Sequence, residues 1–160
     1  MTDTTTEAAS LAETIARIAK DTERTIAVAE SLTGGALSST LASAPDAADW
    51  YAGGVIAYRK ATKQRLLGVD EGPVVTADCA IQMARGVREL LAVDLSVALT
   101  GVGGPGQEEG QPPGTVFIAV GSQLGEQVHR HRFEGTPETV VTQTVEQALR
   151  HLRDELLRER

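Results

Sequence analysis

Two short apolar segments constrain the fold more than any other feature of this sequence. Residues 25–29 (TIAVA) and 94–100 (DLSVALT) are apolar and contain β-branched residues, which is the pattern of a strand buried on both faces of a sheet. Such a strand needs a covering layer on each side, and amphipathic helices usually supply it. The sequence therefore predicts a sheet with helices packed on both of its faces.

Helix and strand patterns alternate through the rest of the chain. Helices are predicted at residues 8–19, 35–41, 59–69, 76–91 and from 137 nearly to the C-terminus, and further strands at 53–58, 114–120 and 125–133. We expect the last two strands to form an antiparallel hairpin, which makes the sheet a mixed one. The prediction is an α/β fold, a three-layer α/β/α sandwich with a mixed sheet, in a single domain at 8–158 that follows a flexible N-terminus at 1–7.

Composition limits the functions that this chain can have. The formal net charge is −7 and aromatic residues make up 3% of the sequence, so a nucleic-acid surface is not expected. Cys79 is the single cysteine, which excludes an internal disulfide and a paired-cysteine zinc site, and no metal or cofactor is expected. No apolar run approaches the roughly 18 residues of a membrane span, and the N-terminus lacks a secretory pattern. These observations predict a cytoplasmic protein without a membrane partner.

Two glycine-rich loops follow the buried strands. ESLTGG (30–35) comes after the first strand and TGVGGPG (100–106) ends the strand at 94–100. Ligands of open α/β sheets bind beyond the carboxyl ends of the strands, and glycine lets backbone N–H groups approach an anion. The second loop fits GxGxxG, but a strand follows it instead of a helix, so we reject a dinucleotide site. A tight turn remains the alternative for either loop, while the long loop at 103–114 is expected to be functional or mobile.

Ser31, in the first of these loops, is the first candidate nucleophile. Its ordinary alternative is an N-cap hydroxyl for the following helix. The histidines do not offer a base, because all three lie in the polar strand at 125–133 or in the last helix, where we expect them to be solvated: His129, His131 and His151. A Ser-His-Asp triad therefore has little support.

Lysine is the remaining candidate base. Lys60 and Lys63 both follow the strand at 53–58, and serine–lysine pairs are a known form of activated serine. The amine must be neutral to accept a proton, and lowering its pKa from about 10.4 to about 7 costs roughly 4–5 kcal/mol. Spacing does not choose between the two lysines, and a solvated basic helix face is the alternative. Trp50 and Tyr51 are either an interface anchor of an oligomer or part of the core.

Several segments together carry a family resemblance. AESLTGG (29–35), GGVIAYRKATKQRLLGV (53–69), DLSVALTGVGGPG (94–106) and EEGQPPGTVFIAV (108–120) resemble the CinA C-terminal domain family of competence/damage-inducible proteins, which includes nicotinamide-nucleotide amidase. The likeness extends from about Ala8 to Leu157. It implies a three-layer α/β/α protein that hydrolyses the carboxamide of nicotinamide mononucleotide to nicotinate mononucleotide and ammonia. It further implies a metal-free, cytoplasmic protein that forms homo-oligomers.

The resemblance also implies roles for individual residues. The family serine falls on Ser31, and the pattern GGxxxYxxxxK places its tyrosine and lysine on Tyr58 and Lys63, so the resemblance selects Lys63 over Lys60. Neutral Lys63 would take the proton of Ser31, while Tyr58 would relay a proton or orient the lysine. Backbone N–H groups near residues 33–35 would hold the oxyanion. Substrate contacts are expected from Glu30, Thr33, Gly34, Gly35, Thr100, Gly101, Gly103, Gly104 and Gly106, and which loop holds the phosphate stays open.

Four positions depart from the family pattern. Leu32 replaces a cysteine, which we interpret as a packing change, and Gln111 replaces a loop lysine. Pro137 and Val141 replace two arginines that are candidates for binding an anionic substrate. Their absence leaves two alternatives open, a related amidase with another substrate and a non-catalytic nucleotide-binding or regulatory protein. A role with DNA finds no basic surface to support it.

Overall fold

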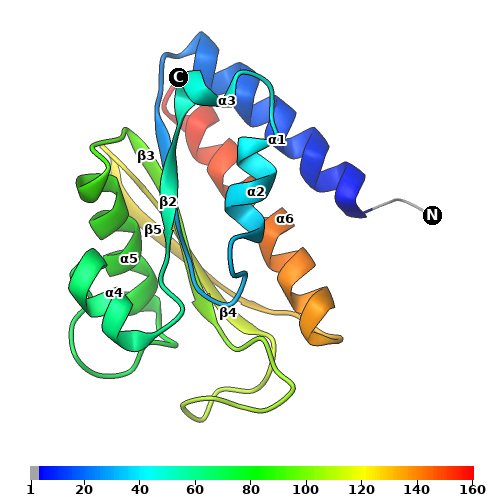
Figure 1. Cartoon of the computed structure of the whole chain (residues 1–160), viewed down its shortest axis with the longest axis vertical. Coiled ribbons are helices and arrows are strands. Elements are labelled where there is room, and N and C mark those ends of the chain that lie inside the picture. The colour runs from blue at the N-terminus through cyan, green and yellow to red at the C-terminus, as the bar shows by residue number, and fades with distance from the viewer. Residues whose placement is uncertain (1–3) are drawn as a thin grey trace.

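A five-stranded mixed sheet lies at the centre of the computed structural model, which describes residues 4–160 (Figure 1). The strand order is β2-β1-β3-β4-β5. β1 pairs in parallel with β2 and with β3, whereas β4 is antiparallel to β3 and β5. The carboxyl ends of the three parallel strands therefore lie at one edge of the sheet. The strands are β1 (Ile26–Glu30), β2 (Tyr51–Ile56), β3 (Leu95–Gly101), β4 (Thr115–Ser122) and β5 (Gly125–Arg132).

Helices cover both faces of this sheet. In Figure 1, α1, α2, α3 and α6 lie on one side, and α4 and α5 lie on the other. The arrangement confirms the predicted three-layer α/β/α sandwich with a mixed sheet. The helices are α1 (Thr4–Asp21), α2 (Ala36–Ala42), α3 (Ala47–Trp50), α4 (Lys60–Leu67), α5 (Ala77–Leu90) and α6 (Pro137–Arg158).

The two faces of the sheet differ in side-chain size. Because successive residues of a strand point to opposite faces, Ile26 and Val28 of β1 pack toward α1 and α6, while Ala27 and Ala29 pack toward α5. β3 and β4 show the same alternation, with their larger aliphatic side chains on the α1/α6 face, although β4 also places Phe117 on the α5 face. The short alanine side chains let α5 approach the sheet closely. Small and large apolar residues therefore alternate along β1.

The element boundaries differ from the predictions in a few places. β2 begins at Tyr51 and ends at Ile56, and the short helix α3 before it was not predicted. Trp50 ends α3 and is buried, with its indole N–H donating to the carbonyl of Pro45, so it belongs to the core. Helix α1 begins at Thr4, and the part of the predicted flexible N-terminus at 1–3 lies outside the described residues.

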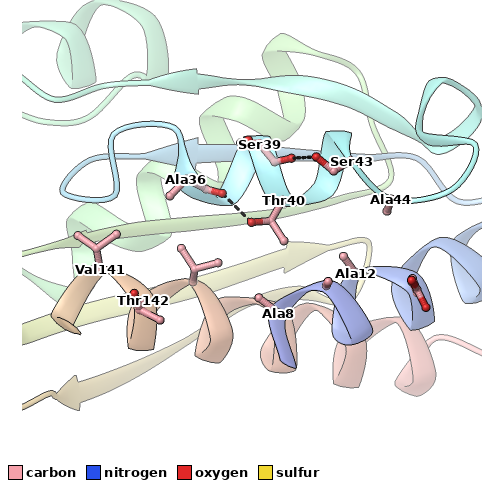
Figure 2. Close-up of a pocket in the computed structure, with 12 residues that line it drawn as sticks. Ala8, Ala12, Ala36, Ser39, Thr40, Ser43, Ala44, Val141 and Thr142 are labelled. Atoms are coloured by element: carbon pink, nitrogen blue, oxygen red, sulfur yellow. Dashed lines mark hydrogen bonds between the residues drawn. The ribbon is translucent and has the colours of Figure 1, made fainter. Parts of the chain in front are cut away.

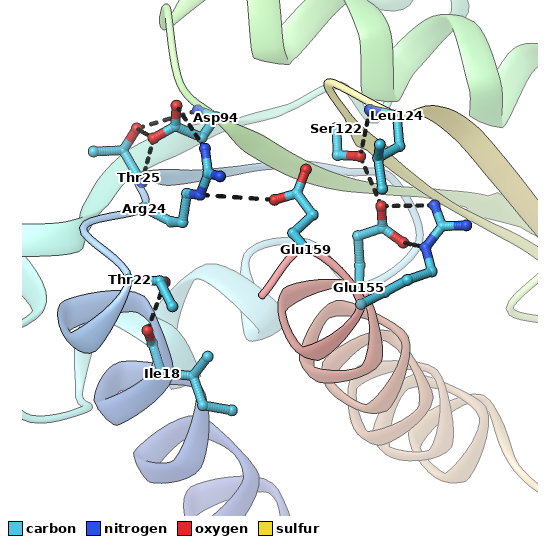
Figure 3. Close-up of polar contacts among 10 residues, drawn as sticks. Ile18, Thr22, Arg24, Thr25, Asp94, Ser122, Leu124, Glu155 and Glu159 are labelled. Atoms are coloured by element: carbon cyan, nitrogen blue, oxygen red, sulfur yellow. Dashed lines mark hydrogen bonds and ion pairs between the residues drawn. The ribbon is translucent and has the colours of Figure 1, made fainter.

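Polar contacts fix the edge of the sheet from which the parallel strands start (Figure 3). The Asp94 carboxylate, just before β3, accepts from the backbone N–H of Thr25 at 2.8 Å, just before β1. Near the end of β4, the Ser122 hydroxyl donates to Glu155 of α6 at 2.7 Å. The first bond joins the starts of β1 and β3, and the second joins the end of β4 to α6. In residues 4–160, no helix has the length and hydropathy that crossing a bilayer requires.

Candidate functional site

Ser31 and Lys63 lie next to each other at the carboxyl edge of the sheet. Ser31 follows β1 directly, and Lys63 lies in α4, the helix after β2. Glu30 pairs with Ile56 where these two parallel strands end, so the segments that follow them leave the sheet side by side. The Lys63 Nζ atom lies 2.9 Å from the Ser31 Oγ atom. The topology therefore brings together a hydroxyl and an amine that are 32 residues apart in the sequence.

Lys63 is buried although it is a lysine. Its side chain is 2% exposed, and its Nζ donates to the carbonyl oxygens of Ala57 at 2.7 Å and Tyr58 at 3.4 Å. Burial lowers the pKa of Lys63, while the charges of Cys79, Glu108 and Glu109 act in the opposite direction. The ion pairs among the described residues do not include this amine.

Three oxygen atoms surround the Lys63 amine: the Ser31 hydroxyl and the carbonyls of Ala57 and Tyr58. A neutral lysine has two N–H bonds and one lone pair, and the two carbonyl oxygens can accept both N–H bonds. The lone pair then remains for the proton of the Ser31 hydroxyl. The arrangement can therefore deprotonate the serine as it attacks an electrophile.

Ser31 does not cap the helix that follows it. The N-cap position of α2 is Gly35, and the partner of the Ser31 hydroxyl is Lys63. The side chain that closes the start of α2 is the carboxylate of Glu30, which is completely buried. A carboxylate is favourable at a helix N-terminus, where the unpaired N–H groups carry partial positive charge. The N-cap interpretation of Ser31 is therefore wrong.

Glu30 was expected to contact substrate, but it lines neither of the cavities around Ser31. Its two oxygens are fully occupied inside the loop and the first turn of α2. Gly34 and Gly35 have φ values of +57° and +110°, which glycine adopts easily, and they turn the chain back over this carboxylate. Glu30 thus fixes the loop behind the nucleophile. Its donors are the Thr33 hydroxyl at 2.6 Å and the backbone N–H groups of Gly35 at 3.2 Å, Leu37 at 3.0 Å and Ser38 at 2.8 Å.

The same bonds revise the expected oxyanion donors. The N–H of Gly34 donates to the carbonyl of Ser31, and that of Gly35 donates to Glu30, so neither is free to bind an oxyanion. In the described part of the chain, the N–H groups of Leu32 and Thr33 donate to no protein atom. Of these two residues, Leu32 lines the second cavity, so its N–H is the one placed to reach a ligand.

Two cavities meet at Ser31. The first, of about 380 Å³, extends toward α4, and the second, of about 310 Å³, extends along the glycine-rich loop after β3. Both are lined by Ser31, Tyr58, Gly101 and Glu108. The first also contains Lys60, Lys63, Val74, Val75, Thr100 and Glu109, and the second contains Leu32, Val102, Gly103, Gly104, Gly106, Gln107, Pro137 and Val141.

The residues predicted in the loop after β3 all line this cleft. Thr100 and Gly101 lie in the first cavity, and Gly101, Gly103, Gly104 and Gly106 lie in the second. By contrast, the described lining of the two cavities contains neither Thr33 nor Gly34 nor Gly35. The first glycine loop therefore supports the nucleophile from behind, while the second forms the wall that a ligand would touch.

Tyr58 lies at the mouth of both cavities and is 69% exposed. Within residues 4–160, its hydroxyl forms no hydrogen bond to Ser31 or Lys63. Its backbone carbonyl, and not its phenol, contacts the lysine amine. The geometry thus favours Tyr58 as a wall of the cleft over a proton relay.

Sequence reasoning missed two acidic residues of the cleft. Glu109 accepts hydrogen bonds from the backbone N–H groups of Val74 and Val75 at 2.6 to 3.2 Å, which fastens the 103–114 loop to the segment before α5. Glu109 and Gly110 have φ values of +51° and +74°, which form a tight turn beside Glu108. The dipeptide Glu109-Gly110 was the only local sequence signal for this turn, and it did not indicate what the two carboxylates contact.

The histidines were expected to be solvated, and they instead form a half-buried cluster between β5 and α6. The rings of His129 and His151 stack with centroids 3.9 Å apart, and the Nε2 atoms of His131 and His151 are 2.9 Å apart. Burial lowers the pKa of His151 to about 4, and His129 and His131 add to the effect. The expectation failed because β5 faces α6 at these positions.

A third cavity, between α1, α2 and α6, has a volume of about 380 Å³ but contains neither Ser31 nor Lys63 (Figure 2). Its walls are mostly small side chains, and the hydroxyls of Thr40 and Ser43 donate to carbonyls of their own helix. Among the described residues that line it, the ionisable side chain is that of Glu13, at an exposed position of α1, and there is neither a lysine nor a histidine. The cleft at Ser31 is therefore the candidate active site.

Comparisons with known proteins agree with this fold. Residues 8–156 match the family model described as CinA C-terminal domain. The chain is 39% identical over 153 residues to a CinA-like protein of Thermotoga neapolitana, covering 90% of this chain and 36% of that protein. It is 37% identical over 150 residues to a CinA-like protein of Geobacter metallireducens, covering 90% and 36%. The chain thus spans about a third of the length of these curated relatives.

Solved structures are also similar. A competence-damaged protein (CinA) superfamily protein from Enterobacter cloacae superposes with a TM-score of 0.89 at 31% identity, covering 93% of this chain and 92% of that one. A competence/damage inducible protein from Agrobacterium tumefaciens gives 0.88 at 26% identity, covering 94% and 95%. The likeness therefore includes the whole three-layer sandwich.

Proposed function

The chain belongs to the CinA C-terminal domain family, and on this basis we propose that it is an amidohydrolase that converts nicotinamide mononucleotide to nicotinate mononucleotide and ammonia. One observation carries the proposal: the 2.9 Å contact between the Ser31 hydroxyl and the buried amine of Lys63. The family resemblance supplies the substrate, and the geometry supports a serine–lysine mechanism.

Acylation would begin with proton transfer from Ser31 to neutral Lys63. The Oγ atom forms a bond to the carboxamide carbon, and the oxyanion accepts a hydrogen bond from the N–H group of Leu32, which lines the second cavity. One such donor is worth about 3 kcal/mol in other hydrolases. Collapse of the intermediate breaks the C–N bond, and Lys63 returns the proton to the leaving nitrogen. Ammonia departs and an ester remains on Ser31.

Deacylation would reverse these roles. Lys63, again neutral, takes a proton from a water molecule, whose oxygen attacks the ester carbon. The C–O bond to Ser31 then breaks, Lys63 returns its proton to Oγ, and the product leaves as a carboxylic acid that gives its remaining proton to the solvent. Burial lowers the pKa of Lys63, and the ion pairs among the described residues do not include its amine, which favours the neutral form that both steps need.

Ammonia release tests the proposal. Purified protein is incubated with nicotinamide mononucleotide, beside Ser31→Ala, Lys63→Met and, as a matched control, Lys20→Met, which changes a surface lysine paired with Asp46. We expect turnover by wild type and the control, and a loss of about 10³-fold or more in both site variants. Turnover that survives Ser31→Ala would remove serine from the mechanism.

A second candidate function is nucleotide binding without catalysis, in a regulatory protein. It is favoured by one observation, that Pro137 and Val141 give the second cavity no cation where the family pattern has arginines. Saturable binding of nicotinamide mononucleotide with no ammonia release would support it. The cytoplasmic location and the homo-oligomer that the resemblance implies remain proposals, and size-exclusion chromatography tests the latter.

A further inference from the structure

The cleft contains few cationic side chains that could bind the phosphate of a nucleotide substrate. The second cavity is lined, within residues 4–160, by no lysine, arginine or histidine, and its ionisable side chains are Tyr58 and Glu108. The first cavity holds Lys60 and Lys63 together with Glu108 and Glu109. Once Lys63 is neutral, as the proposed mechanism requires, this leaves one cation against two carboxylates. Each cavity then carries net negative charge.

The negative charge affects a phosphorylated substrate whichever of the two cavities its phosphate enters. The carbon that reacts must lie at Ser31 Oγ, where the two cavities meet, so the rest of the substrate extends into one or the other. A phosphate dianion would face Glu108 in the second cavity, and Glu108 with Glu109 in the first. Repulsion and the loss of hydration both oppose its binding. The side chains that line the cleft therefore contribute little to binding a phosphate group.

The same charges favour a cationic ring near Ser31. Glu108 and Tyr58 line both cavities beside the nucleophile, and Tyr58 presents an aromatic side chain that is 69% exposed. A carboxylate attracts a positive ring, and an aromatic face binds a cation or stacks on it. The pyridinium ring of a nicotinamide nucleoside carries such a charge next to its carboxamide.

Resting on the proposed function, we infer that this cleft selects a carboxamide on a cationic aromatic ring with an uncharged tail, and that a phosphomonoester on the tail adds no affinity. The ribose would lie along Gly103, Gly104 and Gly106, where bare backbone leaves room for a neutral polyol. The preferred substrate class is therefore the nucleoside and not the nucleotide.

Paired kinetics test the inference. Ammonia release is measured with nicotinamide riboside and with nicotinamide mononucleotide at equal ionic strength. We expect kcat/KM for the riboside to equal or exceed that for the mononucleotide, by up to about tenfold. A preference for the mononucleotide of more than about threefold overturns the inference and leaves the proposed amidase function intact.

A charge-insertion variant sharpens the test. Val141 lines both the second cavity and the third cavity between α1, α2 and α6, whereas its neighbour Thr142 lines the third cavity but not the second (Figure 2). Val141→Arg should raise kcat/KM for the mononucleotide about tenfold or more with no matching gain for the riboside. Thr142→Arg adds the same charge one residue away and should leave the ratio of the two substrates unchanged. An equal response of the two variants contradicts the inference.

Binding to Ser31→Ala separates this inference from the proposed function. Calorimetry with both ligands measures affinity without turnover. If wild type releases no ammonia from either compound, the amidase proposal fails, and the ratio of the two dissociation constants still decides the inference. Tighter binding of the riboside, or equal binding, supports it, and tighter binding of the mononucleotide refutes it.

Discussion

The carboxylate of Glu30 accepts a hydrogen bond at 2.8 Å from the backbone N–H of Ser38, eight residues further along the chain. With its other bonds to the loop, this contact fixes the start of α2 beneath the residue that bears the candidate nucleophile. The position of Ser31 thus depends on a neighbour that no ligand reaches.

Replacing Glu30 with glutamine should weaken both the fold and the activity. The new NH₂ group cannot accept from the N–H groups it would face, so buried donors lose their partner. We expect a loss of about 2–4 kcal/mol in the free energy of unfolding, measured by urea denaturation, and a fall in kcat. Glu13→Gln, at an exposed position of α1, is the control and should change stability by less than about 0.5 kcal/mol. Equal stability of the two variants would contradict this role.

The activity should rise with pH as Lys63 loses its proton. Burial lowers the pKa of this amine, so the rise in kcat/KM should lie below the pH at which an ordinary lysine titrates, about 10.4. The charge of Glu108 raises the pKa, because a carboxylate favours the ammonium form. Glu108→Gln should therefore move the rise to lower pH. A rise that stays fixed in this variant, or moves to higher pH, would argue against Lys63 as the base.

Gly86→Ala should displace the helix that carries the lysine. A Cβ atom at Gly86 of α5 would lie 2.1 Å from the carbonyl oxygen of Leu67, the last residue of α4. Helix propensity alone predicts a gain of up to about 1 kcal/mol from this change. We expect instead a loss of more than about 2 kcal/mol and reduced ammonia release. Glu89→Ala, exposed on the same helix, is the control, and a stabilised Gly86→Ala would refute the close packing.

The histidine cluster should make stability depend on pH. The pKa of His151 is lowered to about 4 in the fold, so the unfolded chain binds its proton first. Its contribution is present above about pH 6.5 and is lost as the pH falls toward 4. The groups that face His151 are His129 and His131 of β5 together with Gln147 and Asp154 of α6.

His151→Leu removes this titration and serves as the comparison. Between pH 7 and pH 4, the wild type should lose about 2 kcal/mol more stability than the variant, after discounting for partial exposure of the ring. Urea denaturation at both pH values measures the difference. Parallel losses in the two proteins would show that carboxylates alone cause the acid sensitivity.

Much of the fold could be predicted because its strands carry a clear signal. The predicted buried strands at 25–29 and 94–100 are each offset by one residue from β1 and β3. The glycine loops follow these strands as expected. The proximity of Ser31 and Lys63 was predicted from the family pattern, and the structure has these residues in contact. Spacing alone could not select Lys63 over Lys60, because the choice depends on which side of α4 is buried next to Ser31, and the structure buries Lys63 and exposes Lys60.

What was missed depends on contacts between distant segments. Nothing in a sequence shows that Glu109 binds the N–H groups of residues 35 and 34 positions earlier, since a carboxylate at a loop tip is usually solvated. The histidine cluster needs the register of β5 against α6. Glu30 was assigned to substrate because its position beside Ser31 is visible in the sequence, whereas its orientation into α2 is not.

The carbonyl oxygens that hold the Lys63 amine belong to Ala57 and Tyr58, six and five residues before it. The short stretch 57–63 therefore supplies two of the hydrogen-bond partners of its own amine, while the serine and the packing that buries the lysine come from other parts of the chain. A hydrolase designed around this stretch would need two parts: the segment itself after an edge strand of a parallel sheet, and a covering helix that excludes water from the amine as α5 and its neighbours do here.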